Sequence, residues 1–394
     1  MLYIGAKSLN SLSLSNAFER IGIEVKMVDP ADLALPESRL RRKLRIWIDN
    51  VFNHSDEQPI SDPIMQGREI RRLRRDHLTS SQSIELINQN IRNIATDFKP
   101  DITFLFHYHY IDAETLDLCH KYGPIFCFFP DDAFTPERYT LRAYNAIRRI
   151  DCVMSTKSFN ISEFYAIGIP VALFVNNSYD PELLHPVDIS DEEADIYGCD
   201  VSFVGNNYIR DRTDFLAALV VRCPNIKFGI WGNYWNRVRL LHQIVNPCRY
   251  WRYRKLSIYS HKPITYVELC KVHVASKINL GLLYAGDGPA RVRDYQTTRS
   301  IEIPATGGFM LAEYTDEHDA MFKEGVEAAY FHSFDDLVDK IHYYLENDEE
   351  RIKIAEAGLQ RCNNSDYTFD DRARTLINEY NKWCLKNKRP QFIL

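Results

Sequence analysis

The stretch PDITFLFHYHYIDAETLDLCHKYGPIFCFFPDD, residues 100–132, contains two apolar runs of strand length with a helical segment between them. A strand, a helix and a second strand in this order predict two parallel strands of one sheet, because a parallel connection needs a long crossover. The stretch therefore predicts an α/β fold.

The same alternation continues on both sides of this stretch. The N-terminus has the strand-like run LYIGA, a polar segment KSLNSLSL interpreted as a loop, a helix SNAFERIG ending at Gly22, and the run EVKMVD. DCVMSTK and PVALFVNN extend the first series, and a second series contains DVSFVGN, IKFGIWG, INLGLLY, GFMLAE and AAYFH with helical segments between them. The pattern predicts two doubly wound, Rossmann-like halves that face each other across a cleft.

The expected domain boundaries follow from where this alternation breaks. Residues 1–180 form the first domain, with an irregular basic insertion at about 36–80, and the acidic, proline-containing residues 181–199 form a linker. Residues 200–365 form the second domain, and the helical segment 366–394 is expected to return to the first.

Composition limits the classes of function. A net charge of −6 over 394 residues argues against a general polyanion binder, and nine cysteines without a C-x-x-C pair favour reduced thiols over disulfides or a zinc site. No signal peptide and no run of about 18 apolar residues is found. We expect a cytoplasmic protein, with any membrane contact peripheral and at the inner face.

Residues 294–315, DYQTTRSIEIPATGGFMLAEYT, combine charged side chains with a glycine pair. In a helix over 297–306, Arg299 and Glu302 share one face, with Asp294 ahead of it. A carboxylate accepts hydrogen bonds from neighbouring hydroxyls and an arginine binds phosphate, so the segment suits a sugar nucleotide. A surface ion pair is the competing interpretation. Gly307 and Gly308 permit either a helix cap or the close approach of a ligand.

Residues 276–377, which include this segment, resemble the C-terminal domain of group 1 glycosyltransferases, in the branch related to spore-maturation CgeB-like proteins. The looser matches DVSFVGNNYIRDRTDFLAAL and FFPDDAF extend the resemblance. It implies a GT-B fold, with a UDP- or GDP-linked sugar held by the C-terminal domain and the acceptor by the N-terminal one. It also implies that Glu302 holds the ribose hydroxyls, and that Asp294 replaces a glutamate at the donor sugar.

Further donor-binding candidates follow from the resemblance. Gly205, Arg210 and Arg212 lie where the family receives the diphosphate, and His261 and Tyr266 lie where it lines the base pocket. Surface pairing of the two arginines with nearby aspartates remains an alternative. At Gly232 the strand-end Trp231 can stack on a base, although packing is favoured. The resemblance implies no cofactor and no metal, since basic groups and helix dipoles hold the diphosphate, and the sequence has no D-x-D.

The first half offers candidates for a catalytic base. His107 and His109 end one strand on a common face, and Asp131 and Asp132 end the next. Any of them can deprotonate an acceptor hydroxyl, which an inverting enzyme requires. Histidines whose hydrogen bonds are satisfied by backbone are equally common at sheet ends.

Two basic patches have several interpretations. Ten Lys or Arg residues occur within 39–45 and 68–75, and CRYWRYRKLSIY, residues 248–259, interleaves cations with aromatics. Anionic lipid headgroups, a lipid-linked acceptor, a nucleic-acid backbone or plain solvent each suit such patches.

The leading hypothesis is a glycosyltransferase that moves a sugar to a hydroxyl of a glycan or lipid-linked saccharide. The alternatives are a glycosyltransferase that modifies nucleic acid and an inactive nucleotide-sugar binding protein.

Overall fold

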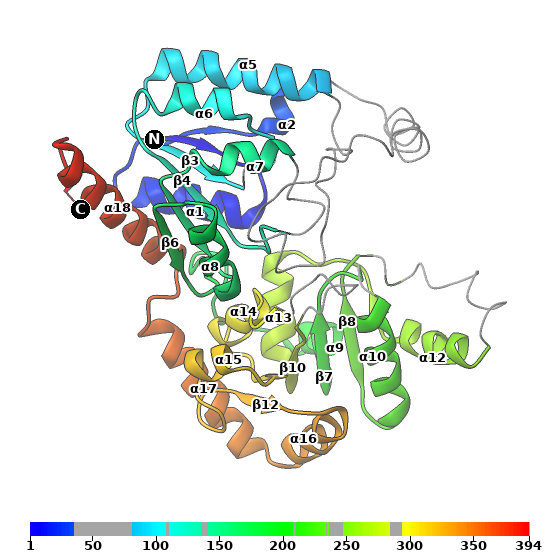
Figure 1. The fold of residues 1–394 in the computed structure, drawn as a ribbon. Helices are drawn as coiled ribbons and strands as arrows, with labels where there is room; N and C mark the ends of the chain where they lie inside the picture. The colour runs from blue at the N-terminus through cyan, green and yellow to red at the C-terminus, as the bar shows by residue number, and fades with distance from the viewer. Residues whose placement is uncertain are drawn as a thin grey trace. The chain divides into compact units, whose positions relative to one another are not determined.

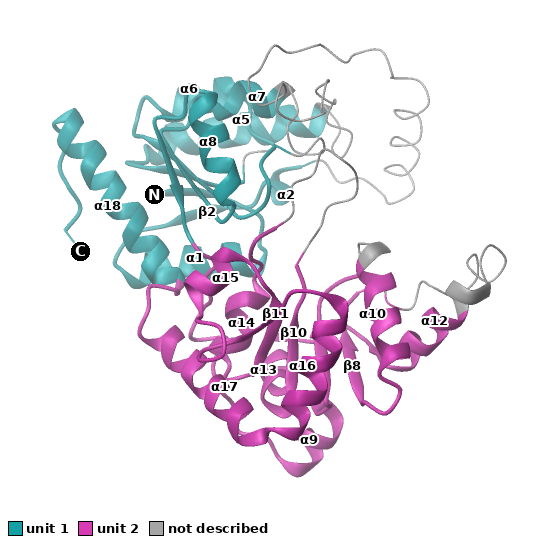
Figure 2. Ribbon diagram, turned by 60° about the horizontal axis from the view of Figure 1, so that its bottom comes forward, with its two compact units in different colours: residues 1–175, 369–394 teal, residues 176–368 magenta. Residues whose placement is uncertain are grey.

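The computed structural model describes residues 1–34, 81–107, 110–134, 141–207, 210–233, 235, 247–283 and 294–393. It contains two compact units (Figure 2). Unit 1 comprises Met1–Val175 and Phe369–Leu394, and unit 2 comprises Asn176–Thr368. Each unit has its own six-stranded parallel sheet, as the alternation of strands and helices predicts.

Unit 1 has the strand order β2-β1-β3-β4-β5-β6. Its strands are β1 (Leu2–Ile4), β2 (Lys26–Val28), β3 (Thr103–Phe106), β4 (Ile125–Phe129), β5 (Cys152–Ser155) and β6 (Val171–Phe174). Its helices are α1 (Leu9–Arg20), α2 (Pro30–Leu33), α5 (Ser81–Phe98), α6 (Ala113–Cys119), α7 (Leu141–Ile147), α8 (Ser158–Ala166) and α18 (Phe369–Asn387). Helices α1 and α18 lie on one face of the sheet, and α5, α6 and α7 on the other (Figure 1).

The C-terminal helix α18 is an integral part of unit 1. Its buried side chains Phe369, Leu376 and Ile377 join the same apolar cluster as Phe18 of α1. An ion pair of 2.5 Å between Arg20 and Asp370 fixes the two helices at the edge of this cluster. Without α18, the apolar face of α1 next to it would be exposed to solvent.

Unit 2 has the strand order β12-β11-β10-β7-β8-β9. Its strands are β7 (Val201–Val204), β8 (Phe228–Trp231), β9 (Ser260–His261), β10 (Ile278–Gly281), β11 (Met310–Glu313) and β12 (Ala329–Phe331). Its helices are α9 (Asp191–Tyr197), α10 (Arg210–Arg222), α12 (Pro247–Ile258), α13 (Tyr266–Ala275), α14 (Arg299–Ala305), α15 (Asp316–Met321), α16 (Phe334–Glu346) and α17 (Asp348–Asn363).

The order of strands in unit 2 reverses between β7 and β10. From β7 the chain first runs outward through β8 and β9, and then returns to the other side of β7 to form β10, β11 and β12. In open parallel sheets this reversal leaves a crevice at the carboxyl ends of the two central strands, where ligands bind. The side chains that follow β7 and β10 are therefore the first place to look for a site.

Two segments differ from the sequence-based expectation. The segment KSLNSLSL, expected to be a loop, is helical from Leu9, because its serines face the interior and Tyr3 donates a hydrogen bond to the Ser11 carbonyl. The expected linker 181–199 lies within unit 2 and contains α9. A capping box of Ser190 and Glu193 begins this helix, and an ion pair between Glu193 and Lys271 ties it to α13.

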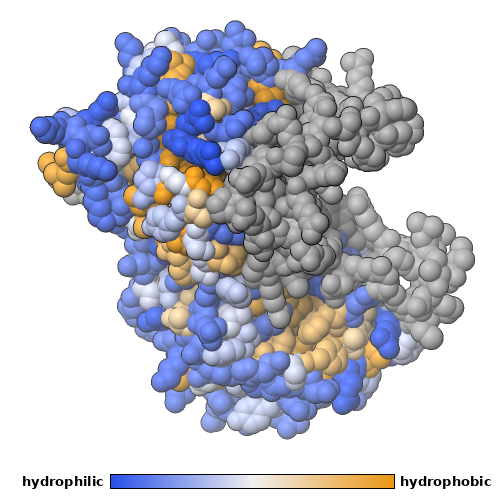
Figure 3. Space-filling model, viewed as in Figure 1, coloured by the Kyte–Doolittle hydropathy of each residue, from blue (hydrophilic) through white to orange (hydrophobic). Residues whose placement is uncertain are grey.

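The polarity of the surface and the burial of the cysteines are typical of a protein with packed apolar cores. The face shown in Figure 3 is mainly hydrophilic, with smaller hydrophobic areas on each unit. In the described part of the chain no helix is long and apolar enough to cross a membrane. The eight cysteines described are all free and buried.

Candidate functional site

Arg299, the first residue of α14, places its guanidinium at the strand-order reversal of unit 2. Nη2 donates a 2.7 Å hydrogen bond to the carbonyl of Leu282, which directly follows β10. Nη1 lies beside Gly205, because a Cβ atom built on that glycine would be 3.2 Å from it. Arg299 therefore connects the ends of β7 and β10 at the predicted ligand crevice.

The aromatic ring of Phe203 supports two cations at this point. The guanidinium carbon of Arg299 is 5.2 Å from the ring centre, and that of Arg212 is 5.5 Å from it. Both distances fall within the range of cation–π attraction. Phe203 is buried in β7, so the ring is a fixed support for both side chains. No pattern in the sequence predicts this role, since phenylalanine in a strand is normally a core residue.

The charge of Arg299 is poorly compensated. Burial and then the positive charge of Arg212 lower the pKa of Arg299, and the negative charges of Glu302 and Asp294 oppose this shift. Among the described residues, Nε of Arg299 and the hydroxyl of neighbouring Thr297 are buried without a hydrogen-bond partner. An anion bound at this place would restore the missing compensation, because buried cations require a counter-charge.

Glu302 lies one turn after Arg299 on α14 and is half-buried. Burial raises the pKa of Glu302, while the charge of Arg299 and a hydrogen bond from Thr298 partly oppose the shift. Its negative charge also contributes to the pKa of Tyr266, which burial chiefly raises to about 12. The charge of Glu302 thus acts at Tyr266, and a phenol and a carboxylate are each able to bind sugar hydroxyls.

A buried chain of hydrogen bonds positions α14. Nδ1 of His318 donates to the carbonyl of Glu313 at 2.7 Å, and this fixes the tautomer, since a carbonyl only accepts. Nε2 then accepts a 2.7 Å bond from the hydroxyl of Ser300, which itself accepts from the amide of Thr297. Burial lowers the pKa of His318 to about 3, so the imidazole is neutral at pH 7.

The residues that lead into α14 are anchored through Gln296. Its side-chain carbonyl accepts from the amide of Asn177 at 2.9 Å, and its amide group donates to Asn176 at 3.1 Å and to Glu317 at 2.9 Å. The side chain is fully buried. Asp294 lies two residues before this anchor, close enough for its charge to act on Arg299.

Two of the four glycines predicted for the donor site, Gly205 and Gly232, lie against each other. A Cβ atom on Gly232 would be 2.1 Å from the carbonyl oxygen of Gly205, and its φ of 146° is one that side chains disfavour. The same carbonyl accepts a 2.8 Å hydrogen bond from the indole of Trp235. The ends of β7 and β8 can approach this closely because residue 232 is glycine.

Gly307 and Gly308 end α14 in a Schellman motif. Gly307 has a φ of 80° and donates to the carbonyl of Pro304, while Gly308 donates to that of Ile303. A Cβ atom on Gly308 would be 2.8 Å from Nδ2 of Asn279. Capping and close packing thus account for both glycines, and their predicted contact with the donor stays a prediction.

Trp231 packs in the core, which confirms the packing role favoured over base stacking. It is buried at the end of β8, and its ring is stacked on that of His261 with the centroids 4.8 Å apart. His261 is exposed, and partial burial of its imidazole, followed by the charge of Lys227, lowers its pKa. His261 therefore remains accessible to a ligand, whereas Trp231 does not.

In unit 1 the structure brings together two of the predicted base candidates. Nε2 of His107 is 4.0 Å from a carboxylate oxygen of Asp131, and both follow the carboxyl ends of neighbouring strands. His107 has a φ of 67°, an uncommon backbone conformation for a side chain other than glycine. Its ring packs edge-on against Phe129, with centroids 4.7 Å apart.

Asp132 has a different environment from Asp131. It is buried and accepts hydrogen bonds from the amide of Phe134 at 3.1 Å and from Asn160 of α8 at 3.0 Å. These contacts fix the turn after β4, so a structural role accounts for Asp132. His109, the side chain of Arg210 and the first basic insertion lie outside the described residues.

No group of three or more His, Cys, Asp or Glu residues suited to a metal ion occurs among the residues described. The expectations of no metal and no cofactor stay predictions.

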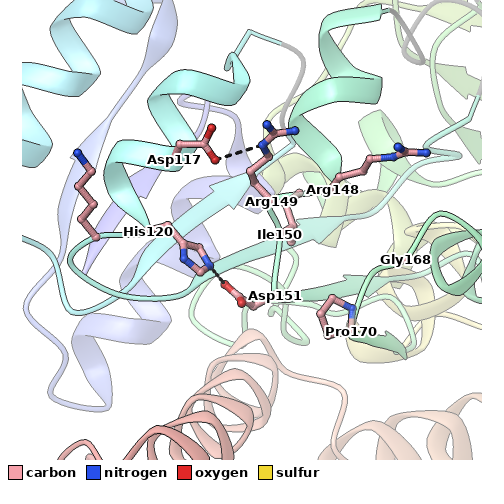
Figure 4. A pocket seen from close by; sticks show the side chains of 9 residues that line it. Asp117, His120, Arg148, Arg149, Ile150, Asp151, Gly168 and Pro170 are labelled. Atoms are coloured by element: carbon pink, nitrogen blue, oxygen red, sulfur yellow. Dashed lines mark hydrogen bonds and ion pairs between the residues drawn. The ribbon is translucent and has the colours of Figure 1, made fainter.

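A separate polar cavity of about 560 Å³ lies in unit 1 (Figure 4). Its lining includes an ion pair between His120 and Asp151 at 2.9 Å and one between Arg149 and Asp117 at 3.2 Å. Asp151 also accepts from the amide of Ile125. Because Asp151 and Ile125 lie at the amino ends of β5 and β4, this cavity is at the opposite edge of the sheet from His107.

Part of the chain matches a known family. Residues 210–378 match the family model described as glycosyl transferase-like, and this span includes Arg212, Arg299 and Glu302. No curated protein matches the sequence.

Solved structures match over nearly the whole chain. Sucrose-phosphate synthase from Thermosynechococcus elongatus has a TM-score of 0.64 at 11% identity, covering 98% of this chain and 99% of its own. HepE from Anabaena, in complex with UDP and glucose, has a TM-score of 0.61 at 10% identity, covering 97% and 99%. A glycosyltransferase from Rickettsia africae has a TM-score of 0.61 at 12% identity, covering 98% of each chain. The predicted GT-B fold is confirmed and residues 210–378 carry a glycosyl transferase-like domain, whereas the CgeB-like branch stays a prediction.

Proposed function

We propose that this chain, which carries a glycosyl transferase-like domain in a GT-B fold, transfers a sugar from a nucleoside-diphosphate sugar to a hydroxyl of a glycan or lipid-linked saccharide. The observation that carries the proposal is the under-compensated guanidinium of Arg299 at the strand-order reversal of unit 2. UDP is the preferred nucleotide to test, because the similar HepE structure is a complex with UDP and glucose.

In this proposal, unit 2 binds the donor. Arg299 and Arg212 contact the diphosphate, and Glu302 accepts hydrogen bonds from the ribose hydroxyls. The role of Asp294 is to contact the donor sugar. Tyr266 and His261 stay candidates for the base or ribose, since the charge of Glu302 acts on the first and the second is exposed.

The chemical step transfers the anomeric carbon from one oxygen to another. Its bond to the oxygen of the diphosphate breaks, and a bond to the acceptor oxygen forms. Negative charge grows on the leaving diphosphate, and the fixed charges of Arg299 and Arg212 stabilise it more than they stabilise the intact donor. The proton of the acceptor hydroxyl passes to a base, for which the pair of His107 and Asp131 is the candidate.

The decisive experiment measures donor binding before any acceptor is known. Isothermal titration with UDP, GDP and their glucose conjugates is expected to show binding of at least one of them to the wild-type chain and a large loss in Arg299→Met. Absence of binding to all of these ligands would contradict the proposal. A panel of nucleotide sugars with hydrolysis as readout then separates a transferase from a binding protein.

A further inference from the structure

Helix α12 has an exposed face with two large apolar side chains. Tyr253 and Leu256 are buried in the core of unit 2, and the Tyr253 hydroxyl donates to the carboxylate of Asp214 on α10. On the other side, Trp251 is 51% exposed and Ile258 is 72% exposed. Residues seven apart lie on one stripe of a helix, so both side chains point away from the unit.

Cations surround these two apolar side chains. Lys255 lies between them on the same stripe, with Nζ 4.6 Å from the ring centre of Trp251. Arg252 and Arg254 are exposed, and the helical rotation of about 100° per residue places them on either side of the stripe. Figures 1 and 2 both show α12 beside α10 at the outer edge of unit 2.

The sequence around α12 lacks acidic residues. Between Asp214 and Glu268, residues 215–267 contain nine Lys or Arg and no Asp or Glu. The chain as a whole has 54 acidic residues in 394, so about seven would be expected in a segment of this length. The positive charge of α12 thus has no neighbouring carboxylates in sequence, although the net charge of the protein is −6.

We propose that the outer face of α12, defined by Trp251, Arg252, Arg254, Lys255 and Ile258, docks on an anionic lipid bilayer. Exposed tryptophan and aliphatic side chains flanked by cations are typical of helices that lie in the membrane interface. The tryptophan ring and Ile258 enter the boundary of headgroups and acyl chains, while the cations contact lipid phosphates. The proposal concerns a surface of unit 2 and does not depend on the proposed transferase activity.

The chemistry of this face favours a bilayer over a nucleic acid. A nucleic-acid groove uses cations for phosphates and aromatic rings for stacking on bases. Ile258 is more exposed than Trp251 and has no ring to stack, and Lys255 already occupies one face of the Trp251 ring. A lipid interface accommodates both features, because it takes aliphatic side chains and places cations beside them.

Exposed apolar residues elsewhere in unit 2 supply a matched control. Ile352 of α17 is 52% exposed and is followed by exposed Lys353, but acidic Glu349 and Glu350 precede it. The double variant Ile352→Ser/Lys353→Glu therefore makes the same two residue changes as Ile258→Ser/Lys255→Glu. The changes on α17 lie beside acidic residues, whereas those on α12 lie among cations.

The test is co-sedimentation of the full chain with vesicles of phosphatidylcholine alone or mixed with phosphatidylglycerol. We expect binding to the anionic vesicles only, weakening with added salt. Each basic side chain near an anionic surface strengthens binding about fivefold, so Arg252→Glu/Arg254→Glu is expected to weaken it at least about 25-fold. Trp251→Ala is expected to weaken it about tenfold. The double variant Ile258→Ser/Lys255→Glu is expected to lose binding to anionic vesicles, and the control Ile352→Ser/Lys353→Glu is expected to retain it.

Circular dichroism and thermal unfolding establish that each variant is folded. Three outcomes overturn the proposal: no sedimentation with anionic vesicles at low salt, sedimentation unaffected by the α12 substitutions, or equal sedimentation with phosphatidylcholine alone. Binding of duplex DNA or RNA that depends on α12, without vesicle binding, also overturns it and favours a nucleic-acid partner. UDP titration of the same variants is expected to match the wild type, which keeps this test separate from the donor-binding test.

Discussion

The guanidinium of Arg299 lies 5.2 Å from the ring centre of Phe203, at the end of the central strand β7. An aromatic ring attracts the cation without neutralising its charge, whereas a carboxylate would neutralise it. Phe203 thus fixes the position of Arg299 and leaves its charge available to a bound anion. This relationship links the fold of unit 2 to the proposed donor chemistry.

Replacing Arg299 is expected to weaken binding of a nucleoside diphosphate by about 30-fold or more, since a buried charged contact to a ligand contributes about 2 kcal/mol or more. In Arg299→Met, the free energy of unfolding is expected to be unchanged or higher, because an apolar side chain relieves a buried cation beside Arg212. Isothermal titration with UDP and urea unfolding measure the two effects. Arg374→Met, at an exposed ion pair in unit 1, is the control that keeps wild-type binding.

Glu302→Gln separates stability from binding. Since burial raises the pKa of Glu302 above its unfolded value, ionisation near neutral pH favours the unfolded chain. The neutral amide removes that penalty, so the melting temperature at pH 7 is expected to rise, with the gain absent below about pH 4 where the carboxyl is protonated in both states. Donor affinity is expected to fall about tenfold through loss of charge-assisted hydrogen bonds. A lower melting temperature together with unchanged affinity would refute this assignment.

Phe203→Leu is expected to weaken donor binding about tenfold, because both arginines lose their aromatic support. It also removes buried volume, with a loss of stability of about 1–2 kcal/mol. Phe309→Leu is the matched control, since Phe309 is equally buried in the core of unit 2 and packs on Tyr344. Equal effects of both substitutions on UDP affinity would show that Phe203 acts only through stability.

Gly232→Ala tests the close approach of the ends of β7 and β8. The added Cβ atom would lie 2.1 Å from the carbonyl oxygen of Gly205, and we expect destabilisation of about 3 kcal/mol or more. Gly168→Ala has a similarly unfavourable φ of 91° but no atom within 4 Å, so its expected loss is about 1 kcal/mol. Chemical denaturation of both variants measures the difference, and similar losses would contradict the steric account.

The ion pair between His120 and Asp151 predicts a pH dependence of stability. The hydrogen bond to Asp151 raises the pKa of His120 above its unfolded value near 6.5. The pair's contribution is therefore complete below about pH 6.5 and is lost as pH rises through the folded pKa. His120→Asn is expected to destabilise by less than about 1 kcal/mol at pH 5.5, because the ring is 44% exposed, and by nothing at pH 9. NMR titration of the imidazole protons checks the direction.

The local pattern of apolar residues was sufficient to predict the positions of the strands with long apolar runs and of helix α14. The strands β3, β4, β10 and β11 lie within the apolar runs that predicted them, and the predicted helix over 297–306 is observed at Arg299–Ala305. The predicted start of α1 was wrong. Its serines face inward, but in the sequence they form a polar run that is typical of a loop. Polar residues that are buried by tertiary contacts do not follow the apolar periodicity on which such predictions depend.

The sequence by itself determined the α/β alternation and the placing of Arg299 and Glu302 on one helix, since each depends on residues close together in the chain. Only the tertiary structure decided that Phe203 supports two arginines, that His318 and Gln296 hold the start of α14, and that Asp132 is tied to Asn160. These contacts join residues far apart in sequence, and strand order brings them together at the carboxyl edges of the two sheets.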